Sequence, residues 1–389
     1  MVSYYFAKNL KIKFSFLISI VIILIGSCKE NPALMVEDDV SLNQLKLPLE
    51  VANYSDPSLP SFFKNQFITI QNNTPQSNPT TNWGATLGRV LFYDTLLSIN
   101  NTVSCGSCHQ QSIGFADSAL LSIGFNGGKT GRHSMALANA AYYSNGRFFW
   151  DERAASLEEQ VLEPIQDPIE MGMTMAEVIS RLNATEHYPV LFEYAFGTNE
   201  ITNEGVANAL AQFVRSMVSY TSKYDQGRIL VEDRTADFPN FTQKENRGKK
   251  IFMTHDKVNC FGCHNTDAFI SDNPRNNGLN PFNIDEGIYV HTQNELDRGK
   301  FKTPSLKNVA LRGRFMHDGG LSSLREVIEH YNSGIQMNPN LDSHLIDISS
   351  GTPARMNLSN EEMEELEAFL NTLTDEPFLN DVKYSNPFK

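Results

Sequence analysis

Two short segments of the chain carry two cysteines followed at once by a histidine. They are Cys105-Gly-Ser-Cys108-His109 and Cys260-Phe-Gly-Cys263-His264. This pattern attaches c-type haem, because the two thiols form thioethers with the haem vinyl groups and the histidine is placed as an axial iron ligand. Two such segments therefore predict two covalently bound haems.

A zinc ion is the alternative group that paired Cys-x-x-Cys units could bind. Zinc ribbons usually hold their two pairs about 15–20 residues apart, and they do not require a histidine after each second cysteine. The pairs in this chain begin at residues 105 and 260, and each is followed by histidine. The spacing and the two histidines favour haem over zinc.

The fifth and last cysteine lies at the end of an apolar N-terminal segment. Three lysines within the first 13 residues precede the apolar run 14–25, and small residues lead to Cys28. This pattern predicts a lipoprotein signal peptide over residues 1–27 and a lipid anchor on Cys28, with an uncleaved anchor or an ordinary signal peptide as alternatives. We therefore expect an exported protein, facing the periplasm or held at the outer membrane of a Gram-negative bacterium. With every cysteine assigned, no disulfide is expected.

The composition is that of an ordinary globular protein with an acidic balance. The chain is 41% hydrophobic and 20% charged, and its formal net charge is −13. This charge argues against nucleic acid as a partner and is compatible with a basic redox partner. The part after the signal peptide is long enough for two domains with separate cores.

The segments that must position the haem motifs repeat faintly. A glycine precedes a phenylalanine by four residues shortly before each motif, as Gly88 and Phe92 in the first case and Gly248 and Phe252 in the second. This predicts two related helical units. Strand signals are scarce, and helices are predicted over 156–162, 175–182, 204–220, 323–332 and 359–373, the last with Ser359 as its N-cap.

We predict a mainly α fold with two cytochrome-c-like haem domains. A polar, proline-punctuated tether is expected over residues 28–61. The first haem domain then covers 62–236 and the second covers 237–389, with the boundary in a charged stretch that ends near Pro239.

Beyond the haem motifs, further short motifs follow one another in a specific order over roughly residues 81–373. They are Leu87-Gly88…Leu91-Phe92-x-Asp94…Leu97-Ser98, Phe149-Trp150-Asp151-x-Arg153, Gln160…Pro164-Ile165…Glu170-Met171, Phe301-Lys302-Thr303-Pro304-Ser305-Leu306 and His317-Asp318-Gly319. Taken together with the haem motifs, this series resembles the bacterial di-haem cytochrome c peroxidases and the related enzyme MauG.

The resemblance implies a role for several residues. His109 would hold the catalytic haem, and Glu170 would be the distal acid–base group that moves a proton between the two oxygens of hydrogen peroxide. Gln160 would orient peroxide by hydrogen bonding. Trp150 would lie between the haems and carry electrons from the haem held by His264.

One departure from the family pattern concerns the first haem. Classical members block this iron with a distal histidine sixteen residues after the proximal one, and here that position is Phe125. Phenylalanine cannot ligate iron, so the resemblance implies an iron that is five-coordinate or bound to water without reductive activation. His133 lies nearby in sequence and is the alternative ligand.

A second departure concerns the sixth ligand of the second haem. The family's classical methionine position falls on Tyr331, as in MauG, which implies an anionic donor that lowers the haem potential. His330, Met316 and Met337 are the rival ligands.

A third departure concerns the calcium ion that the family binds between its haems. The position of its asparagine ligand is His133, and the positions of its carbonyl ligands are Arg312 and Arg314. A hard cation prefers oxygen ligands without adjacent positive charge, so this pattern disfavours calcium.

The function that the resemblance implies is reduction of hydrogen peroxide to water with electrons from a small donor protein such as cytochrome c. A MauG-like oxidase acting on a protein or a small molecule is the alternative within enzymes. A non-enzymatic di-haem electron carrier is the alternative of another class, although Glu170 and the missing distal ligand argue against it. A homodimer is compatible with this reading.

Overall fold

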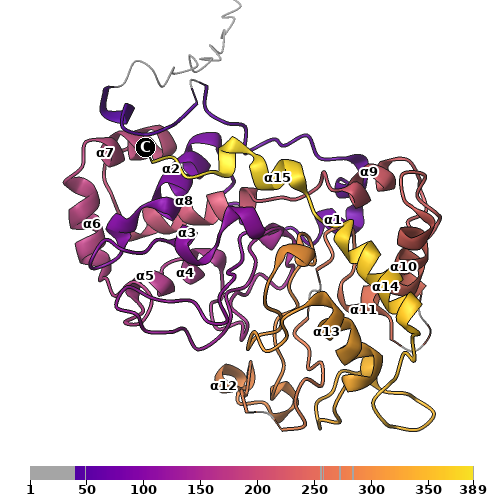
Figure 1. The fold of residues 1–389 in the computed structure, drawn as a ribbon. Helices are drawn as coiled ribbons and strands as arrows, with labels where there is room; N and C mark the ends of the chain where they lie inside the picture. The colour runs from indigo at the N-terminus through magenta and orange to yellow at the C-terminus, as the bar shows by residue number, and fades with distance from the viewer. Residues whose placement is uncertain are drawn as a thin grey trace, which may run out of the picture. The chain divides into compact units, whose positions relative to one another are not determined.

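The computed structural model describes residues 40–48, 50–254, 256, 258–270, 273–282 and 284–388. Along these residues β structure is limited to isolated bridges, while helices and short 3₁₀ segments carry the fold (Figure 1). The predicted mainly α fold is confirmed. The predicted signal peptide and Cys28 lie outside the described residues. Within the described part, no helix is both long enough and apolar enough to cross a bilayer.

The helices follow one another with long irregular connections between them. In chain order they are α1 (Gln66–Thr69), α2 (Asn82–Tyr93), α3 (Cys105–Cys108), α4 (Leu157–Gln160), α5 (Glu163–Gln166), α6 (Met175–Asn183), α7 (His187–Phe196), α8 (Asn203–Ser216), α9 (Lys223–Ile229), α10 (Gln243–Thr254), α11 (Cys260–Cys263), α12 (Tyr289–Thr292), α13 (Leu324–Glu329), α14 (Asn360–Asn371) and α15 (Glu376–Asn380).

Two helix pairs form the centres of two cores. Helix α2 packs on α8 in the N-terminal half, and α10 packs on α14 in the C-terminal half (Figure 1). A Cβ atom on Gly88 would lie 1.9 Å from the carbonyl oxygen of Ala209, and one on Gly248 would lie 1.8 Å from that of Glu365. Each glycine is therefore required where two helix backbones cross closely. This explains half of the faint repeat in the sequence.

The phenylalanines of the repeat line the cavities. Phe92 and Phe252 lie one helical turn after these glycines, and both are buried. Each reaches the cavity next to its own Cys-x-x-Cys-His segment. One short pattern thus joins a close helix crossing to a cavity wall in both halves.

Serine and threonine caps fix the ends of the predicted helices. The Ser359 hydroxyl accepts from the Glu362 N–H, while the Glu362 carboxylate accepts from the Ser359 N–H, as a capping box does. Helix α8 ends at Ser216 rather than at the predicted residue 220. The stretch predicted as one helix over 323–332 divides into α13 and a π-helical turn, His330–Gly334.

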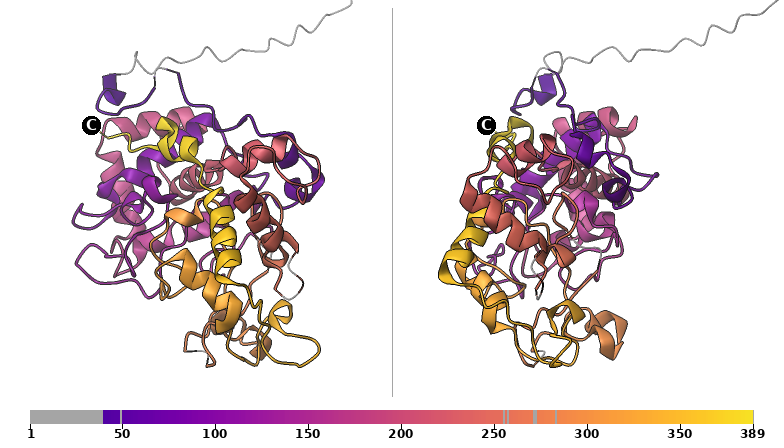
Figure 2. Two further views of the ribbon diagram at one scale, coloured as in Figure 1. Left: turned by 45° about the vertical axis from the view of Figure 1, so that its right-hand side comes forward. Right: turned by 90° about the vertical axis from the view of Figure 1, so that its right-hand side faces the viewer.

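Segments from early and late in the described chain pack together in the core of the N-terminal half. Phe378 and Tyr384 belong to the core of the N-terminal half, where the Tyr384 hydroxyl donates to the Ser216 carbonyl at 2.6 Å. Leu42 and Tyr54 belong to the same core although they fall in the predicted tether. The C-terminal segment therefore returns to the first helices (Figures 1 and 2). Sequence periodicity does not report such long-range packing.

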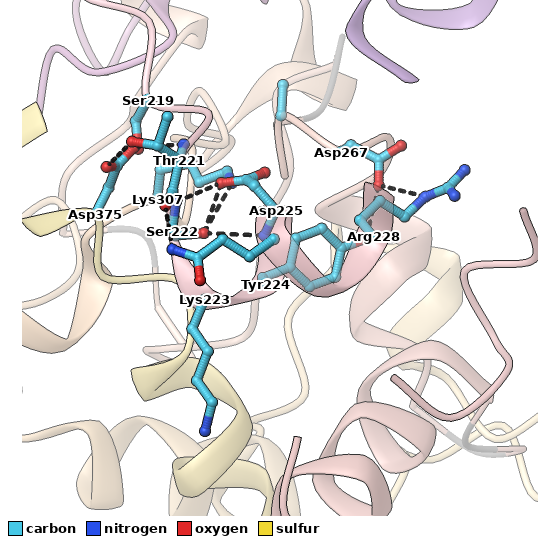
Figure 3. A network of polar contacts seen from close by, with 12 residues as sticks. Ser219, Thr221, Ser222, Lys223, Tyr224, Asp225, Arg228, Asp267, Lys307 and Asp375 are labelled. Atoms are coloured by element: carbon cyan, nitrogen blue, oxygen red, sulfur yellow. Dashed lines mark hydrogen bonds and ion pairs between the residues drawn. The ribbon is translucent and has the colours of Figure 1, made fainter. Parts of the chain in front are cut away.

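A buried polar network lies where α9 joins the two halves (Figure 3). The Lys307 ammonium lies 2.6 Å from the Asp225 carboxylate, and both side chains are completely buried. The Asp375 carboxylate accepts hydrogen bonds from the Ser219 and Thr221 hydroxyls, at 2.8 and 2.5 Å. Buried charges of this kind are tolerated because each has a charged or hydrogen-bonding partner.

Candidate active site

The first Cys-x-x-Cys-His segment forms one helical turn at the wall of a cavity of about 530 Å³. Cys105, Cys108 and His109 all line this cavity. The His109 Nδ1 atom lies 3.1 Å from the Phe115 carbonyl oxygen. A carbonyl can only accept, so Nδ1 carries the proton and Nε2 keeps a lone pair available for a metal. Burial lowers the pKa of His109, which also favours the neutral ring.

The second segment also forms one helical turn, beside a cavity of about 190 Å³, but the buried His264 Nδ1 atom has no hydrogen-bond partner among the described residues. Cys260, Cys263 and His264 line it. Burial lowers the pKa of His264 to about 4, and the carbonyl groups of Phe269 and Pro304 oppose this effect. The ring is therefore neutral near pH 7 and able to bind a metal.

The donor sets of both cavities fit a c-type haem. The four cysteines are free of disulfides. Burial raises the pKa of Cys105 and of Cys260 to about 12, so both thiols are protonated. Two neutral thiols and a neutral imidazole at the wall of a largely apolar cavity are the groups that thioether attachment and axial ligation need. The polypeptide thus presents two haem sites of the same design.

Trp150 lies in the wall of both cavities. Five other residues share this position, and the full set is His133, Ser134, Met135, Ala136, Trp150 and Lys302. The Trp150 indole N–H donates to the His133 carbonyl at 2.7 Å. The structure thus places the predicted inter-haem tryptophan where the two cavities meet.

The shared wall is built from reciprocal hydrogen bonds between the halves. The His133 N–H donates to the His317 carbonyl at 2.9 Å, and the Lys302 N–H donates to the Trp150 carbonyl at 2.8 Å. His133 and Lys302 each lie six residues before an asparagine, Asn139 and Asn308, with φ of 63° and 60°. The two halves therefore contribute equivalent segments to the wall.

Glu170 lies in the wall of the first cavity together with Gln160, which ends α4. The Glu170 N–H donates to the Asp167 side chain at 3.1 Å, which fixes the turn that carries it. Burial raises the pKa of Glu170 to about 7; Asp167 adds to this increase and Arg153 opposes it. A carboxyl group that titrates near neutral pH can both accept and donate a proton.

Phe125 is absent from the wall of this cavity. Its N–H donates to the Glu170 carbonyl at 3.0 Å, and its ring lies against Gly172, where a Cβ atom would approach the ring within 2.6 Å. The phenylalanine at the family's histidine position therefore packs behind the loop that carries Glu170. Gly124, before it, leaves no room for a side chain, because a Cβ there would lie 1.7 Å from the Ile169 carbonyl oxygen.

His133, the alternative ligand, is buried in the shared wall. Its Nδ1 atom lies 3.1 Å and 3.2 Å from the carbonyl oxygens of Ala119 and Leu120, so Nδ1 carries the proton. Its Nε2 atom has no hydrogen-bond partner among the described residues. His133 therefore presents a bare acceptor at the junction of the cavities.

Two of the four candidate ligands for the second haem reach its cavity. Tyr331 and Met316 line it, and the Asn277 amide lies 3.5 Å from the Tyr331 hydroxyl and 3.3 Å from the Met316 sulfur. His330 is outside the lining and donates from Nε2 to the Asn277 carbonyl at 3.1 Å. Met337 is 48% exposed and also outside the lining. Burial raises the pKa of Tyr331, so its phenol is neutral until a metal displaces the proton.

Arg312 and Arg314, at the predicted carbonyl positions of a calcium site, also line the second cavity. The Arg312 guanidinium is buried and donates to the carbonyl oxygens of Ser305 and Lys307, at 2.8 and 2.9 Å. A fixed positive charge therefore stands close to this part of the wall.

Lys302 is a site residue that reasoning from the sequence missed. Lys302 belongs to the Phe301–Leu306 motif, which indicated a match to the family but gave no sign that the lysine side chain is buried. The structure shows its side chain buried in the wall of both cavities. A lysine is expected at the surface, so only the fold reveals it.

Comparisons with known proteins agree with the two-cavity architecture. Residues 82–232 match the family model described as di-haem cytochrome c peroxidase. The chain is 36% identical over 305 residues to the methylamine utilization protein MauG of Methylorubrum extorquens, covering 78% of this chain and 81% of that one. It is 30% identical over 319 residues to the cytochrome c551 peroxidase of Nitrosomonas europaea, covering 78% and 87%.

A solved structure gives the same result. The crystal structure of a MauG-like protein associated with microbial copper homeostasis aligns with a TM-score of 0.71 and 32% identity, over 85% of this chain and 99% of that one. These relatives carry two c-type haems by family, and both peroxidases and MauG proteins occur among them. The chain therefore belongs to the di-haem cytochrome c peroxidase family and is an oxidoreductase of the peroxidase type.

Proposed function

We propose that the protein is a di-haem c-type peroxidase that reduces hydrogen peroxide to water with electrons from a small redox protein such as cytochrome c. The observation that carries this proposal is Glu170, whose carboxyl group lines the first cavity with a pKa raised to about 7 by burial. A pure electron carrier has no use for a proton shuttle above one iron. Peroxide cleavage requires one.

The residues of the first cavity divide the work. Bound through Cys105 and Cys108, a haem would supply an iron able to bind peroxide and exchange electrons. His109 would hold that iron through Nε2. Glu170 accepts the proton of the inner peroxide oxygen and returns it to the outer one, so that water leaves, while the Gln160 amide orients peroxide.

The second cavity would store and deliver electrons. Cys260 and Cys263 would attach its haem, His264 would hold the iron, and Tyr331 would close the sixth position. Support for Tyr331 comes from its place in the cavity wall, which it shares with Met316, whereas His330 and Met337 are outside the lining. Trp150 would carry electrons across the shared wall. Arg312 and Arg314 disfavour a calcium ion, because they put positive charge where a hard cation would bind.

The remaining organisation is part of the same proposal. We propose that residues 1–27 direct export and that Cys28 carries a lipid anchor in the envelope of a Gram-negative bacterium. The proposed haem domains are 62–236 and 237–389, although Phe378 and Tyr384 pack in the first core. A homodimer is compatible with this proposal. Hydrogen peroxide and a basic donor protein are the proposed partners, and the net charge of −13 supports the latter.

A MauG-like oxidase is the second candidate. It is favoured by one pair of observations, namely that Tyr331 lines the second cavity and that Phe125 is unable to ligate the first iron. In that case the oxidising equivalents would pass to a protein or a small molecule. The first cavity and Glu170 would serve peroxide cleavage in the same way.

Rapid mixing of the fully oxidised protein with hydrogen peroxide tests the proposal. We expect an immediate change in the haem absorption spectrum without prior reduction, since Phe125 leaves the first iron accessible. Catalytic consumption of peroxide with reduced cytochrome c would support the peroxidase, and reaction without such turnover would favour the oxidase.

The same experiment can contradict the open first site. If only the half-reduced protein reacts, a ligand such as His133 blocks the oxidised iron, and a His133→Ala variant should then react without reduction. A purely low-spin spectrum and no reaction in any redox state would leave an electron carrier.

A further inference from the structure

Three lysines of the described residues are buried, and two of them have oxygen partners. Lys307 is paired with the Asp225 carboxylate at 2.6 Å. Lys249 donates to the carbonyl oxygens of Arg234, at 3.0 Å, and of Ala236. Both follow the general rule that a buried ammonium group is stable only when paired or hydrogen-bonded to oxygen. Lys302 is the third.

Within the described part of the chain, the Lys302 ammonium has no such oxygen partner. Its acceptor among the described residues is the Met135 sulfur at 3.7 Å, and it stands 4.0 Å from the centre of the Tyr143 ring. A thioether is a weak acceptor, and three N–H donors need more than one. Burial lowers the pKa of Lys302 to about 8, while the Glu152 charge opposes this effect. The group is therefore largely cationic at neutral pH.

Lys302 belongs to the wall that the two cavities share. Lys302 and Met135 both line the first and the second cavity, so a nitrogen in contact with the Met135 sulfur lies at their junction. A group bound in the cavities is therefore in a position to supply the oxygen atoms that this ammonium lacks. A c-type haem keeps two carboxylate side chains on one edge, and these are strong acceptors for an ammonium group.

We propose that Lys302 binds one carboxylate of each haem and thereby fixes the haem edges at the shared wall. This inference rests on the proposed attachment of a haem in each cavity. The backbone supports it, because the Lys302 N–H donates to the Trp150 carbonyl at 2.8 Å and locks the lysine beside the inter-haem tryptophan. Lys302 acts as a positioning residue, because it holds the edges of both haems. Its positive charge also stabilises the reduced state of both irons.

Replacement of Lys302 by methionine tests the proposal by redox titration of the holoprotein. The variant keeps the length of the side chain but leaves two buried carboxylates without a cation, which favours the oxidised irons. We expect the midpoint potentials of both haems to fall and to become more dependent on pH, because the carboxylates then take up protons. Lys302→Gln should show the same direction with a smaller shift, and it provides the reading if the methionine variant does not fold. Lys302→Arg should restore both potentials.

Lys300→Met is the matched control. Its ammonium is paired with Asp297 at 3.5 Å, and it is outside the walls of both haem cavities, so neither potential should move. Unchanged potentials in Lys302→Met and Lys302→Gln would overturn the proposal and indicate that buried water satisfies the ammonium. A shift of one haem alone would overturn the shared contact. Mass spectrometry of the wild-type protein separates these outcomes from failure of the proposed function, since fewer than two attached haems would contradict haem attachment itself.

Discussion

Ser156 and Ser323 occupy the same position in the two halves of the molecule. Each caps a short helix, accepting from the N–H three residues later, and the leucine after each serine lines the neighbouring cavity. The eighth residue after Ser156 is Pro164, and the eighth after Ser323 is Tyr331. Both reach the cavity of their own half. At this equivalent position the first half has Pro164, whose side chain has no metal-binding atom, and the second half has the phenol of Tyr331.

The residue four positions after each serine is also polar in one half and apolar in the other. Gln160 lines the first cavity and Val327 the second. Glu170 adds a carboxyl group to the first cavity only, while Tyr331 and Met316 bring metal-binding atoms into the second. The comparison teaches that one repeated scaffold acquires two roles through a few side chains in each cavity wall.

The largest effect is expected when the carboxyl group specific to the first half is removed. Glu170→Gln should lower the rate of peroxide reduction by roughly 10²–10⁴-fold, the usual contribution of a positioned acid–base group. Both haems should stay attached, as judged by their absorption spectra. Glu193→Gln, at an exposed position of α7, is the control and should keep full activity. Retained turnover in Glu170→Gln would remove the chemical asymmetry of the halves.

A second contrast lies next to the equivalent asparagines. Lys307 precedes Asn308, and Ala138 precedes Asn139, so only the C-terminal half contains a buried ion pair at this point. Lys307→Met should lower the free energy of unfolding by about 3–5 kcal/mol, because the buried Asp225 carboxylate loses its cationic partner and keeps only hydrogen bonds from Ser222. Denaturant titration measures this loss. The double variant with Asp225→Leu should recover much of it, and equal losses in both would contradict the charge argument.

Substitutions at the two helix crossings should lower the free energy of unfolding by similar amounts if the scaffold is repeated. Gly88→Ala and Gly248→Ala each force a Cβ atom against a carbonyl oxygen. Each should cost about 1–3 kcal/mol or more of unfolding free energy. Gly131→Ala is the control, since a Cβ there would meet nothing within 4 Å and should change stability by less than about 0.5 kcal/mol. A neutral result at one crossing alone would show that the halves pack differently.

The ligand contrast can be inverted in the second half. Tyr331→Met should raise the midpoint potential of the second haem by an amount on the order of 0.1 V, because thioether sulfur favours reduced iron more than phenolate does. Redox titration with optical detection measures the shift. Met316→Leu should leave this potential nearly unchanged. The reverse pattern would identify Met316 as the ligand.

The smallest effect concerns the pH dependence of the first half. Peroxide must give its proton to the ionised form of Glu170, which is populated above its pKa of about 7. The value of kcat/KM for peroxide should therefore fall about tenfold per pH unit below pH 7 and level off above it. The residual activity of Glu170→Gln should lack this inflection. An unchanged inflection would assign the titration to another group.

Much of the local design could be predicted from the sequence. The two Cys-x-x-Cys-His segments, the helix caps and the glycine–phenylalanine spacing before each motif are properties of neighbouring residues. Hydrogen bonds within one or two turns satisfy them, as at Ser359, so the order of residues along the chain is sufficient. Long-range packing was less visible, because the return of Tyr384 to the first core has no periodic signal.

The sequence alone determined that two haem motifs exist, that their halves repeat, and that Phe125 cannot bind iron. Only the tertiary structure decided which side chains meet. In the folded chain, His330 and Met337 lie outside the wall of the second cavity, Phe125 packs behind the Glu170 loop, and Lys302 is buried beside Trp150. The physical reason is that attachment chemistry depends on residue type and spacing, whereas burial, pKa and access to a cavity depend on contacts between residues far apart in the chain.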